Sequence, residues 1–404
     1  MNPRHLSRGE FLSLTSLLAG SSLLPRRADA APKPTAKPAP PPPEPPQGDS
    51  LRRSCRATFT GSTPEDAGTE LIRLGEWIRD QGLPSDAYGQ SAFIQGFEQK
   101  IAERLGFEAG CFMPTGTMGQ LIALRIYADE GGTRTVGLHP SSHHVLHESD
   151  SHTVLHGLQP VVLCPWTRPV LADDVRNARE RLGTLSVELP VRWLGGQLQT
   201  WEQLEELKRT CRERGVKLHM DGARLWESQP FYGRSYADIC RGFDSVYVSF
   251  YKRVGALGGA MVVGSKDFIR TARMWRHRHG GNLFQLLPYV ASAAMKLDTA
   301  LERLPQQVRR AKALSEALAA DSRLVVLPRP AQTNMFRVFL RGDAAEFSRR
   351  RDRIAREDSL WLTHGFGQTR VPGVVDTELQ VGEGLAGLED AQVVRAFLRL
   401  LDPA

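Results

Sequence analysis

Short apolar runs alternate with amphipathic segments through the middle of this chain. Each run has the length of a β-strand. Helical patterns lie between several of the runs, and residues 200–214 are the clearest example. Such alternation predicts a mainly parallel sheet covered by helices on both faces. The predicted strands are 109–113, 135–138, 161–164, 185–189, 216–220, 245–249 and 260–263.

The pattern changes in the last third of the chain. Residues 297–318 have the pattern of a long charged helix, and residues 324–401 mix short strands with helices. We therefore expect a large domain over residues 50–305, which includes an N-terminal arm. A small α+β domain is expected over residues 306–404.

Two further segments precede the predicted fold. Arg4 and Arg8 are followed by an apolar stretch, 11–24, that is too short to span a bilayer. Residues 1–30 resemble an export signal of the twin-arginine type, except that Gly9 stands where the second arginine belongs. Residues 31–49 are rich in proline and predict an extended spacer. We expect a periplasmic protein, with a cytoplasmic protein that carries a disordered leader as the alternative.

Composition argues against several classes of partner. The net charge is +7 over 404 residues, and the densest basic stretch, 348–356, contains an acid and no aromatic residue. That pattern favours a solvated helix face over a nucleic-acid site. No later stretch is long and apolar enough to span a membrane. Five cysteines, without a Cys-x-x-Cys pair, argue against a disulfide framework and against a thiolate zinc site.

A carboxylate and an amine stand at the ends of two apolar runs. Asp221 follows run 216–220 and Lys252 follows run 245–249. The carboxyl ends of parallel strands meet where open α/β sheets bind ligands, so both side chains are expected at one site. The pair suits pyridoxal phosphate, which needs a lysine for its Schiff base and an acid beside its pyridine nitrogen. The alternative is a helix N-cap at Asp221 and a surface lysine at 252, although a buried ammonium is costly.

Gly116, Thr117 and Met118 follow a predicted strand and open a predicted helix. Glycine lets the backbone approach a ligand closely, and the first N–H groups of a helix are free to bind phosphate. A simple helix cap is the alternative. Arg224 is three residues after Asp221 and would lie on the same side if a helical turn follows, where it could donate to the cofactor's phenolic oxygen or to a substrate carboxylate.

Six histidines crowd one stretch of the chain. A metal site is one interpretation, but the spacing after His147-Glu148 does not fit a His-Glu-x-x-His helix, and no thiolate is near. We therefore expect no metal site. For one of the six we favour a neutral imidazole that stacks on a flat cofactor. They are His139, His143, His144, His147, His152 and His156.

Several of these motifs together resemble the threonine aldolase and β-eliminating lyase family. Leu218-His219-Met220-Asp221-Gly222-Ala223-Arg224-Leu225 is similar to the family's His-Leu-Asp-Gly-Ala-Arg-Leu signature. Lys252 falls where the family's Schiff-base lysine falls. The resemblance covers residues 55–301 well. Further similar stretches are Asp86-Ala87-Tyr88-Gly89, the phosphate turn at 114–118, His143 five residues before Glu148, and Gly195-Gly196 after a strand at 187–189.

The chain departs from the family where substrate contacts are expected. Tyr251 replaces a serine beside the lysine, and an arginine is lost at Phe284. Glu378 stands where the family has a late carboxylate-binding arginine, and Arg370 is nearby in sequence. Arg56 lies in a stretch that replaces the family's Ser-Asp-Thr-Val-Thr, and it would supply the missing positive charge.

The resemblance implies an α/β fold of the aminotransferase type (fold type I), with a small α+β C-terminal domain. It implies pyridoxal 5'-phosphate as cofactor and Lys252, His143 and Asp221 as catalytic residues. The cofactor-binding residues that it implies are Gly116, Thr117, Met118, His143, Asp221, Arg224 and Lys252. The implied substrate-binding residues are Arg56, Tyr88 and Arg224.

The activity that the resemblance implies is cleavage of a β-hydroxy-α-amino acid to glycine and an aldehyde. Two alternatives stay open. One is β-elimination or racemisation of a different amino acid, and the other is a protein that binds the cofactor without turnover. The expected partners are a small amino-acid substrate and further copies of the chain, in a homodimer or homotetramer, without nucleic acid or membrane.

Overall fold

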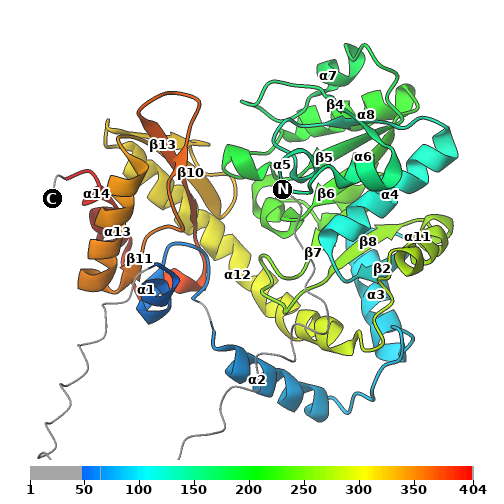
Figure 1. Cartoon of the computed structure of the whole chain (residues 1–404), viewed down its shortest axis with the longest axis horizontal. Coiled ribbons are helices and arrows are strands. Elements are labelled where there is room, and N and C mark those ends of the chain that lie inside the picture. The colour runs from blue at the N-terminus through cyan, green and yellow to red at the C-terminus, as the bar shows by residue number, and fades with distance from the viewer. Residues whose placement is uncertain (1–47, 64, 403–404) are drawn as a thin grey trace, which may run out of the picture. The chain divides into compact units, whose positions relative to one another are not determined.

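The central sheet has seven strands in the order β2-β8-β7-β6-β5-β3-β4 (Figure 1). The computed structural model describes residues 48–63 and 65–402, so the predicted export signal lies outside the described residues. Strands from β4 to β7 pair in parallel, whereas β8 is antiparallel to both of its neighbours. The expected α/β class with a mainly parallel sheet is confirmed. The strands are β2 Ala109–Met113, β3 Thr135–Leu138, β4 Gln159–Val162, β5 Thr184–Glu188, β6 Lys217–Gly222, β7 Ser245–Ser249 and β8 Ala260–Gly264.

Both faces of the central sheet are buried, because successive residues of its strands are apolar. In β7, Val246 and Val248 pack into one core and Tyr247 packs into the other. Helices α3, α8 and the first part of α12 cover the first face, and α4 and α11 cover the second. The helices between residues 67 and 278 are α2 Ala67–Asp80, α3 Ala92–Leu105, α4 Gly116–Gly131, α5 His143–Leu146, α6 Ser151–His156, α7 Ala172–Arg176, α8 Trp201–Glu213, α9 Gln229–Tyr232, α10 Tyr236–Cys240 and α11 Lys266–Arg278, with 3-10 turns η1 Arg192–Leu194 and η2 Leu225–Ser228.

A second sheet forms the C-terminal part of the fold. Its strand order is β12-β13-β10-β9, and its pairs are all antiparallel. Helices α13 and α14 pack on it, and Phe347 and Phe397 anchor them in a separate apolar core. The elements are β9 Leu324–Leu327, β10 Met335–Arg341, α13 Ala344–Asp358, β11 Leu360–Trp361, β12 Gly367–Gln368, β13 Val374–Gln380, η3 Glu383–Leu385 and α14 Asp390–Leu398.

Helix α12, Leu287–Ala319, connects the two cores (Figure 1). Leu297 and Leu304 lie in the core of the central sheet, and Leu314 lies in the core of the second sheet. The helix is longer than the predicted 297–318 and crosses the predicted domain boundary at residue 305. A boundary inside a continuous helix is not visible in the sequence, because the apolar stripe continues across it.

The N-terminal arm packs with the C-terminal core. Strand β1, Ala57–Thr58, pairs in parallel with β11. The ring of Phe59 lies edge-on to that of Phe336, with centroids 5.9 Å apart. Helix α1, Gly48–Ser54, begins inside the range predicted as a spacer. The predicted division assigned this arm to the large domain, whereas residues 48–59 pack with the C-terminal part of the fold.

All five cysteines are buried with free thiols. Among the residues described, no helix combines the length and the apolar character needed to cross a bilayer.

Candidate active site

Asp221 lies at the carboxyl end of β6, in the middle of the sheet. Its neighbours in register are Glu188 of β5 and Tyr247 of β7. The residue is 3% exposed, and its Oδ1 accepts a hydrogen bond from the backbone N–H of Ala223 at 3.1 Å. This bond orients the carboxylate at the edge where the parallel strands end.

Lys252 lies in the loop that follows β7. That loop is tied to the turn after β6, because Ser249 Oγ donates to the carbonyl of Ala223 at 2.7 Å and Trp226 Nε1 donates to the carbonyl of Ser249 at 3.1 Å. Burial lowers the pKa of the Lys252 amine, and the nearby charge of Asp221 opposes this shift without cancelling it. Lys252 and Asp221 therefore lie within electrostatic reach of each other, as their positions in the sequence predict.

His143 begins α5, and its Nδ1 lies 2.9 Å from Glu148 Oε1. His144 Nδ1 lies 2.9 Å from the other oxygen of the same carboxylate. Burial raises the pKa of Glu148, but the hydrogen bonds of the two histidines outweigh burial and hold that pKa at about 2. Glu148 is thus ionised, so each Nδ1 carries a hydrogen, and Nε2 of a neutral His143 is the proton acceptor.

Gly116 is the first residue of α4, where the phosphate turn is predicted. Thr115 is the N-cap, and its hydroxyl accepts from the backbone N–H of Met118 at 3.2 Å. A Cβ at residue 116 would lie only 2.1 Å from Tyr247 Oη, so the backbone approaches β7 as only glycine permits. Thr117 and Met118 are half-buried beside it.

The remaining predicted site residues lie in different surroundings. Arg224 Nη1 donates to Glu227 Oε1 at 3.3 Å, and its side chain is 11% exposed. Tyr88 is exposed and packs edge-on against Phe284, with ring centroids 5.3 Å apart. Arg56 is exposed just before β1, where its backbone N–H donates to Ser359 Oγ. No interaction found in the described residues links Tyr88 or Arg56 to Lys252, and their roles stay predictions.

Arg192, which lies in η1 after β5, was not among the predicted site residues. Its Nε and Nη2 donate to the two carboxylate oxygens of Glu378, at 2.9 and 3.3 Å. The backbone N–H of Arg192 donates to Glu188 Oε1 at 3.0 Å. No motif marked this residue, and its partner lies far away in the sequence, on β13.

Glu188 is a second carboxyl group beside Asp221. Its Oε2 is buried, and it has no hydrogen-bond partner in the part of the chain that the structure describes. Burial raises the pKa of Glu188 to about 8, and the charge of Asp221 adds to the shift. Glu188 therefore holds its proton more strongly than an ordinary glutamate, at the strand end next to Asp221.

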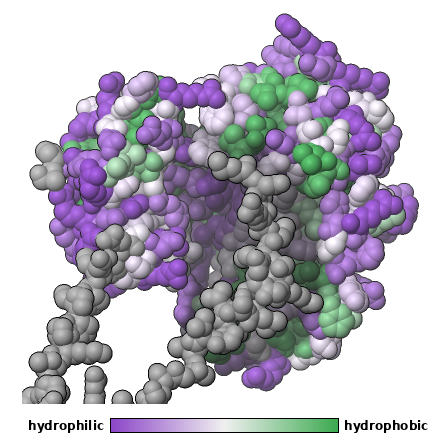
Figure 2. Space-filling view, viewed as in Figure 1, coloured by the Kyte–Doolittle hydropathy of each residue, from purple (hydrophilic) through white to green (hydrophobic). Residues whose placement is uncertain are grey.

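Two large cavities are candidate sites. One, of about 670 Å³, is lined by Lys252 and by charged residues that include Arg73, Arg253 and Glu383. Figure 2 shows a hollow with hydrophilic walls between the part that holds β10 and β13 and the part that holds the central sheet.

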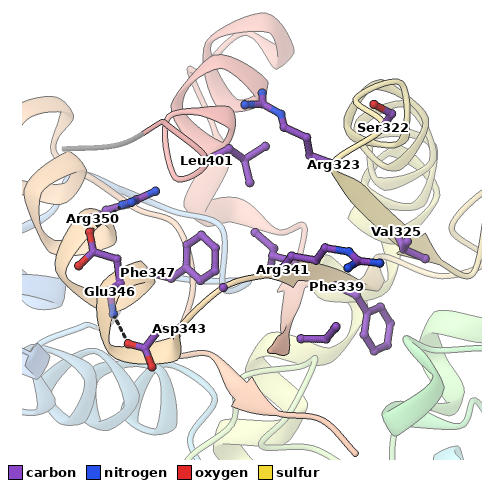
Figure 3. Close-up of a pocket in the computed structure, with 13 residues that line it drawn as sticks. Ser322, Arg323, Val325, Phe339, Arg341, Asp343, Glu346, Phe347, Arg350 and Leu401 are labelled. Atoms are coloured by element: carbon purple, nitrogen blue, oxygen red, sulfur yellow. Dashed lines mark hydrogen bonds and ion pairs between the residues drawn. The ribbon is translucent and has the colours of Figure 1, made fainter. Parts of the chain in front are cut away.

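The other cavity, of about 690 Å³, lies in the C-terminal part and contains none of the predicted site residues (Figure 3). All of its charged side chains except Arg341 are already bonded within the described chain: Arg323 pairs with Asp321, Arg350 pairs with Glu346, and Asp343 caps α13. We therefore assign the chemistry to the site at Lys252.

Other histidines of the histidine-rich stretch contact neighbouring parts of the fold. His139 Nε2 lies 3.0 Å from the carbonyl oxygen of Arg168, and His156 stacks on His279 with centroids 5.0 Å apart. Within residues 48–63 and 65–402, no three histidine, cysteine or carboxylate side chains are grouped to hold a metal ion.

The residues at the central site fit pyridoxal phosphate. Lys252 is an amine with a lowered pKa, and Asp221 is a buried carboxylate. The half-buried His143 has no hydrogen-bond partner for its Nε2 among the residues that the structure describes. The glycine cradle at the start of α4 supplies backbone N–H groups for a phosphate. These groups are the donor set that the cofactor requires.

Known threonine aldolases are similar to this chain in sequence. The chain is 28% identical over 286 residues to low-specificity L-threonine aldolase 1 of Arabidopsis thaliana, and the matched segment covers 68% of this chain and 78% of the relative. It is 30% identical over 243 residues to the low specificity L-threonine aldolase of Escherichia coli (strain K12), and this matched segment covers 58% of this chain and 71% of the relative.

Solved structures extend the likeness to most of the chain. A protein of Listeria monocytogenes EGD-E, assigned as an L-allo-threonine aldolase, has a TM-score of 0.81 and 36% identity. The superposition covers 87% of this chain and 97% of that chain. The model of the β-eliminating lyase family matches residues 82–342. The chain therefore belongs to the β-eliminating lyase family of pyridoxal-phosphate-dependent enzymes.

Proposed function

We propose that this enzyme is a lyase that cleaves a threonine-like β-hydroxy-α-amino acid to glycine and an aldehyde. The relatives described as threonine aldolases support this reaction. The observation that carries the proposal is the position of Asp221 and Lys252 at adjacent strand ends, beside the His143–Glu148 pair.

Four groups of the chain would hold the cofactor. Lys252 would bind its aldehyde carbon, and Asp221 would pair with its pyridine nitrogen. The backbone N–H groups of Gly116 and Thr117 would bind its phosphate beside Met118, whose own N–H donates to Thr115. His143 would cover a face of the ring. When bound, the cofactor withdraws electrons from the carbon next to the substrate's amino group.

The chain's own residues then manage the protons. Lys252 is more readily neutral than an ordinary lysine, and a neutral amine is the form that acts as nucleophile or base. His143 holds its Nδ1 hydrogen on ionised Glu148, which leaves Nε2 to accept the proton of the substrate's hydroxyl group, directly or through water. Glu148 stabilises the imidazolium that results.

The oligomeric state and the cellular location of the protein are two further parts of the proposal. Leu71, Ile72, Tyr88 and Phe284 are large apolar side chains that are 48 to 66% exposed, and we propose that they lie in the interface of a homodimer or homotetramer. We further propose that the leader directs the protein to the periplasm. Light scattering tests the assembly, and fractionation of cells that express the full chain tests the location.

The reaction is tested with purified protein loaded with pyridoxal phosphate. Release of acetaldehyde from threonine, or of benzaldehyde from phenylserine, is expected from the wild type and not from Lys252→Ala. Release of pyruvate and ammonia from serine without aldehyde would indicate β-elimination instead, and loss of optical activity without cleavage would indicate racemisation. Visible cofactor absorption without turnover of any amino acid would indicate a binding protein.

A further inference from the structure

Three guanidinium groups surround the carboxylate of Glu378 at the boundary between the central sheet and the second sheet. Arg192 bonds it directly, Arg337 Nη1 lies 3.8 Å from its Oε2, and the charge of Arg224 also acts on it. One carboxylate from the chain thus faces three cations. The three cations differ in what else they bind and in whether a solute can reach them.

Arg337 and Arg224 are occupied and covered. Arg337 binds Asp376 through Nε at 2.7 Å and Nη2 at 2.6 Å, and its side chain is 8% exposed. Arg224 binds Glu227 and is 11% exposed. The side chain of Arg192 is 44% exposed, so it is the one of the three that a dissolved molecule reaches most easily.

Arg192 also presents an unused edge. Its Nε and Nη2 bind Glu378 side-on, and no other hydrogen bond of its guanidinium is found among the described residues. A guanidinium has a second edge, formed by Nη1 and Nη2, which matches a carboxylate with two parallel hydrogen bonds. Glu378 therefore fixes the plane of the group and leaves that edge open.

The guanidinium of Arg192 lies within electrostatic reach of the reacting groups. Its charge acts on Lys252 and on Glu188. The next residue, Trp193, stacks on His147 with centroids 5.9 Å apart, and His147 lies 5.2 Å from His143. The charge of Arg192 thus acts on the amine of the site, and the neighbouring Trp193 connects it to the imidazole of His143 through His147.

We propose that Arg192 binds the α-carboxylate of the amino-acid substrate through its Nη1–Nη2 edge, and that Glu378 is the positioning residue that holds Arg192 for this contact. This inference rests on the proposed function, because it assigns a carboxylate-bearing substrate to the same site. It also gives Glu378 a role: the carboxylate does not repel the substrate, because its charge is matched by Arg192 and its neighbours.

The test measures ligand binding rather than turnover. Wild-type holoenzyme is titrated with glycine and with 2-aminoethanol, which lacks the carboxylate, and the change in visible cofactor absorption gives each Kd. Arg192→Ala is expected to raise the Kd of glycine about 10- to 100-fold, the value of a charged hydrogen-bonded pair. The Kd of 2-aminoethanol is expected to stay within about twofold of the wild-type value.

Two further variants separate binding from positioning. Arg192→Lys should recover little of the loss, because an ammonium does not form the paired hydrogen bonds. Glu378→Gln should weaken glycine about 3- to 10-fold in the wild type and should have no effect on glycine in the Arg192→Ala background. The matched control is Arg270→Ala, whose exposed ion pair with Asp267 lies on α11.

Each outcome decides the question. An unchanged Kd of glycine in Arg192→Ala overturns the inference, and so does an equal loss of affinity for glycine and 2-aminoethanol, which a merely structural role would give. A wild type that takes up no cofactor overturns both this inference and the proposed function. If glycine binding depends on Arg192 but no aldehyde is released from threonine or phenylserine, the inference stands and the proposed reaction falls.

Discussion

One carboxylate, Glu148, is shared by two imidazoles, and its bond to His143 Nδ1 is 2.9 Å long. The side chain of Glu148 is fully buried, and His144 is buried with it. This geometry fixes which nitrogen of His143 is free. It also makes Glu148 a group on which both the reaction and the stability of the fold depend.

We expect Glu148→Gln to destabilise the protein at pH 7 by about 2–3 kcal/mol, because an ionised buried acceptor is lost. The pKa of Glu148 is lowered from 4.5 to about 2, so its contribution is present above pH 4.5 and is lost as the pH falls towards 2. Urea unfolding of the apoprotein at pH 7 and at pH 3 measures this difference. Equal pH dependence in the variant and the wild type would contradict the assignment.

We expect Lys252→Ala to fold and to lose covalent capture of pyridoxal phosphate. Because burial lowers the pKa of Lys252 below its usual 10.5, the wild type should reach its maximal rate of capture at a lower pH than a free lysine. Borohydride reduction followed by peptide mass spectrometry locates the modified residue. The exposed Lys266 serves as the matched control, and a label that persists in Lys252→Ala would contradict the role.

Glu188→Gln is expected to remove part of the pH dependence of stability. Burial and Asp221 raise the pKa of Glu188 from 4.5 to about 8 in the folded state. Its proton is therefore held by the folded chain and released by the unfolded one, so wild-type stability falls as the pH rises from 4.5 to 8. Urea unfolding of the apoprotein at pH 5 and pH 8.5 should show a smaller fall in the variant, and an identical fall would exclude this explanation.

Gly116→Ala is expected to cost about 1–3 kcal/mol of stability and to weaken cofactor binding, because overpacking displaces the start of α4. The added Cβ would lie 2.1 Å from Tyr247 Oη. Gly131→Ala, at the other end of the same helix, has no atom within 4 Å of its added Cβ and is the matched control. Thermal unfolding and the Kd of pyridoxal phosphate should change in the first variant only.

The sequence predicted the central sheet closely, because its strands are short, apolar and separated by amphipathic helices. The ranges 109–113, 135–138 and 245–249 agree with β2, β3 and β7 residue for residue. The antiparallel direction of β8 was not specified, since an apolar run has the same composition in either direction. The length of α12 was underestimated, because its first turns are apolar rather than charged.

Site residues were predictable where the residue type and its place in the sequence pattern alone indicate the chemistry. Asp221 and Lys252 were identified because each is a charged residue at the end of an apolar run, where burying a charge is costly unless it is paired or used in function. Arg192 was missed, since its function depends on a pairing with Glu378 that only the folded chain creates. The contacts of the N-terminal arm were also missed. They too depend on partners far away in the sequence, and β1 is a strand of only two residues, which is too short to show a pattern.

That arm affects the order in which the protein can assemble during its synthesis. Every strand of the central sheet lies between residues 109 and 264, so that sheet can form while the ribosome still adds the rest of the chain. Phe59 instead packs in a core whose other members extend to Leu400. One of the first structured segments to leave the ribosome must therefore wait for nearly the last residues of the chain before it finds its partners.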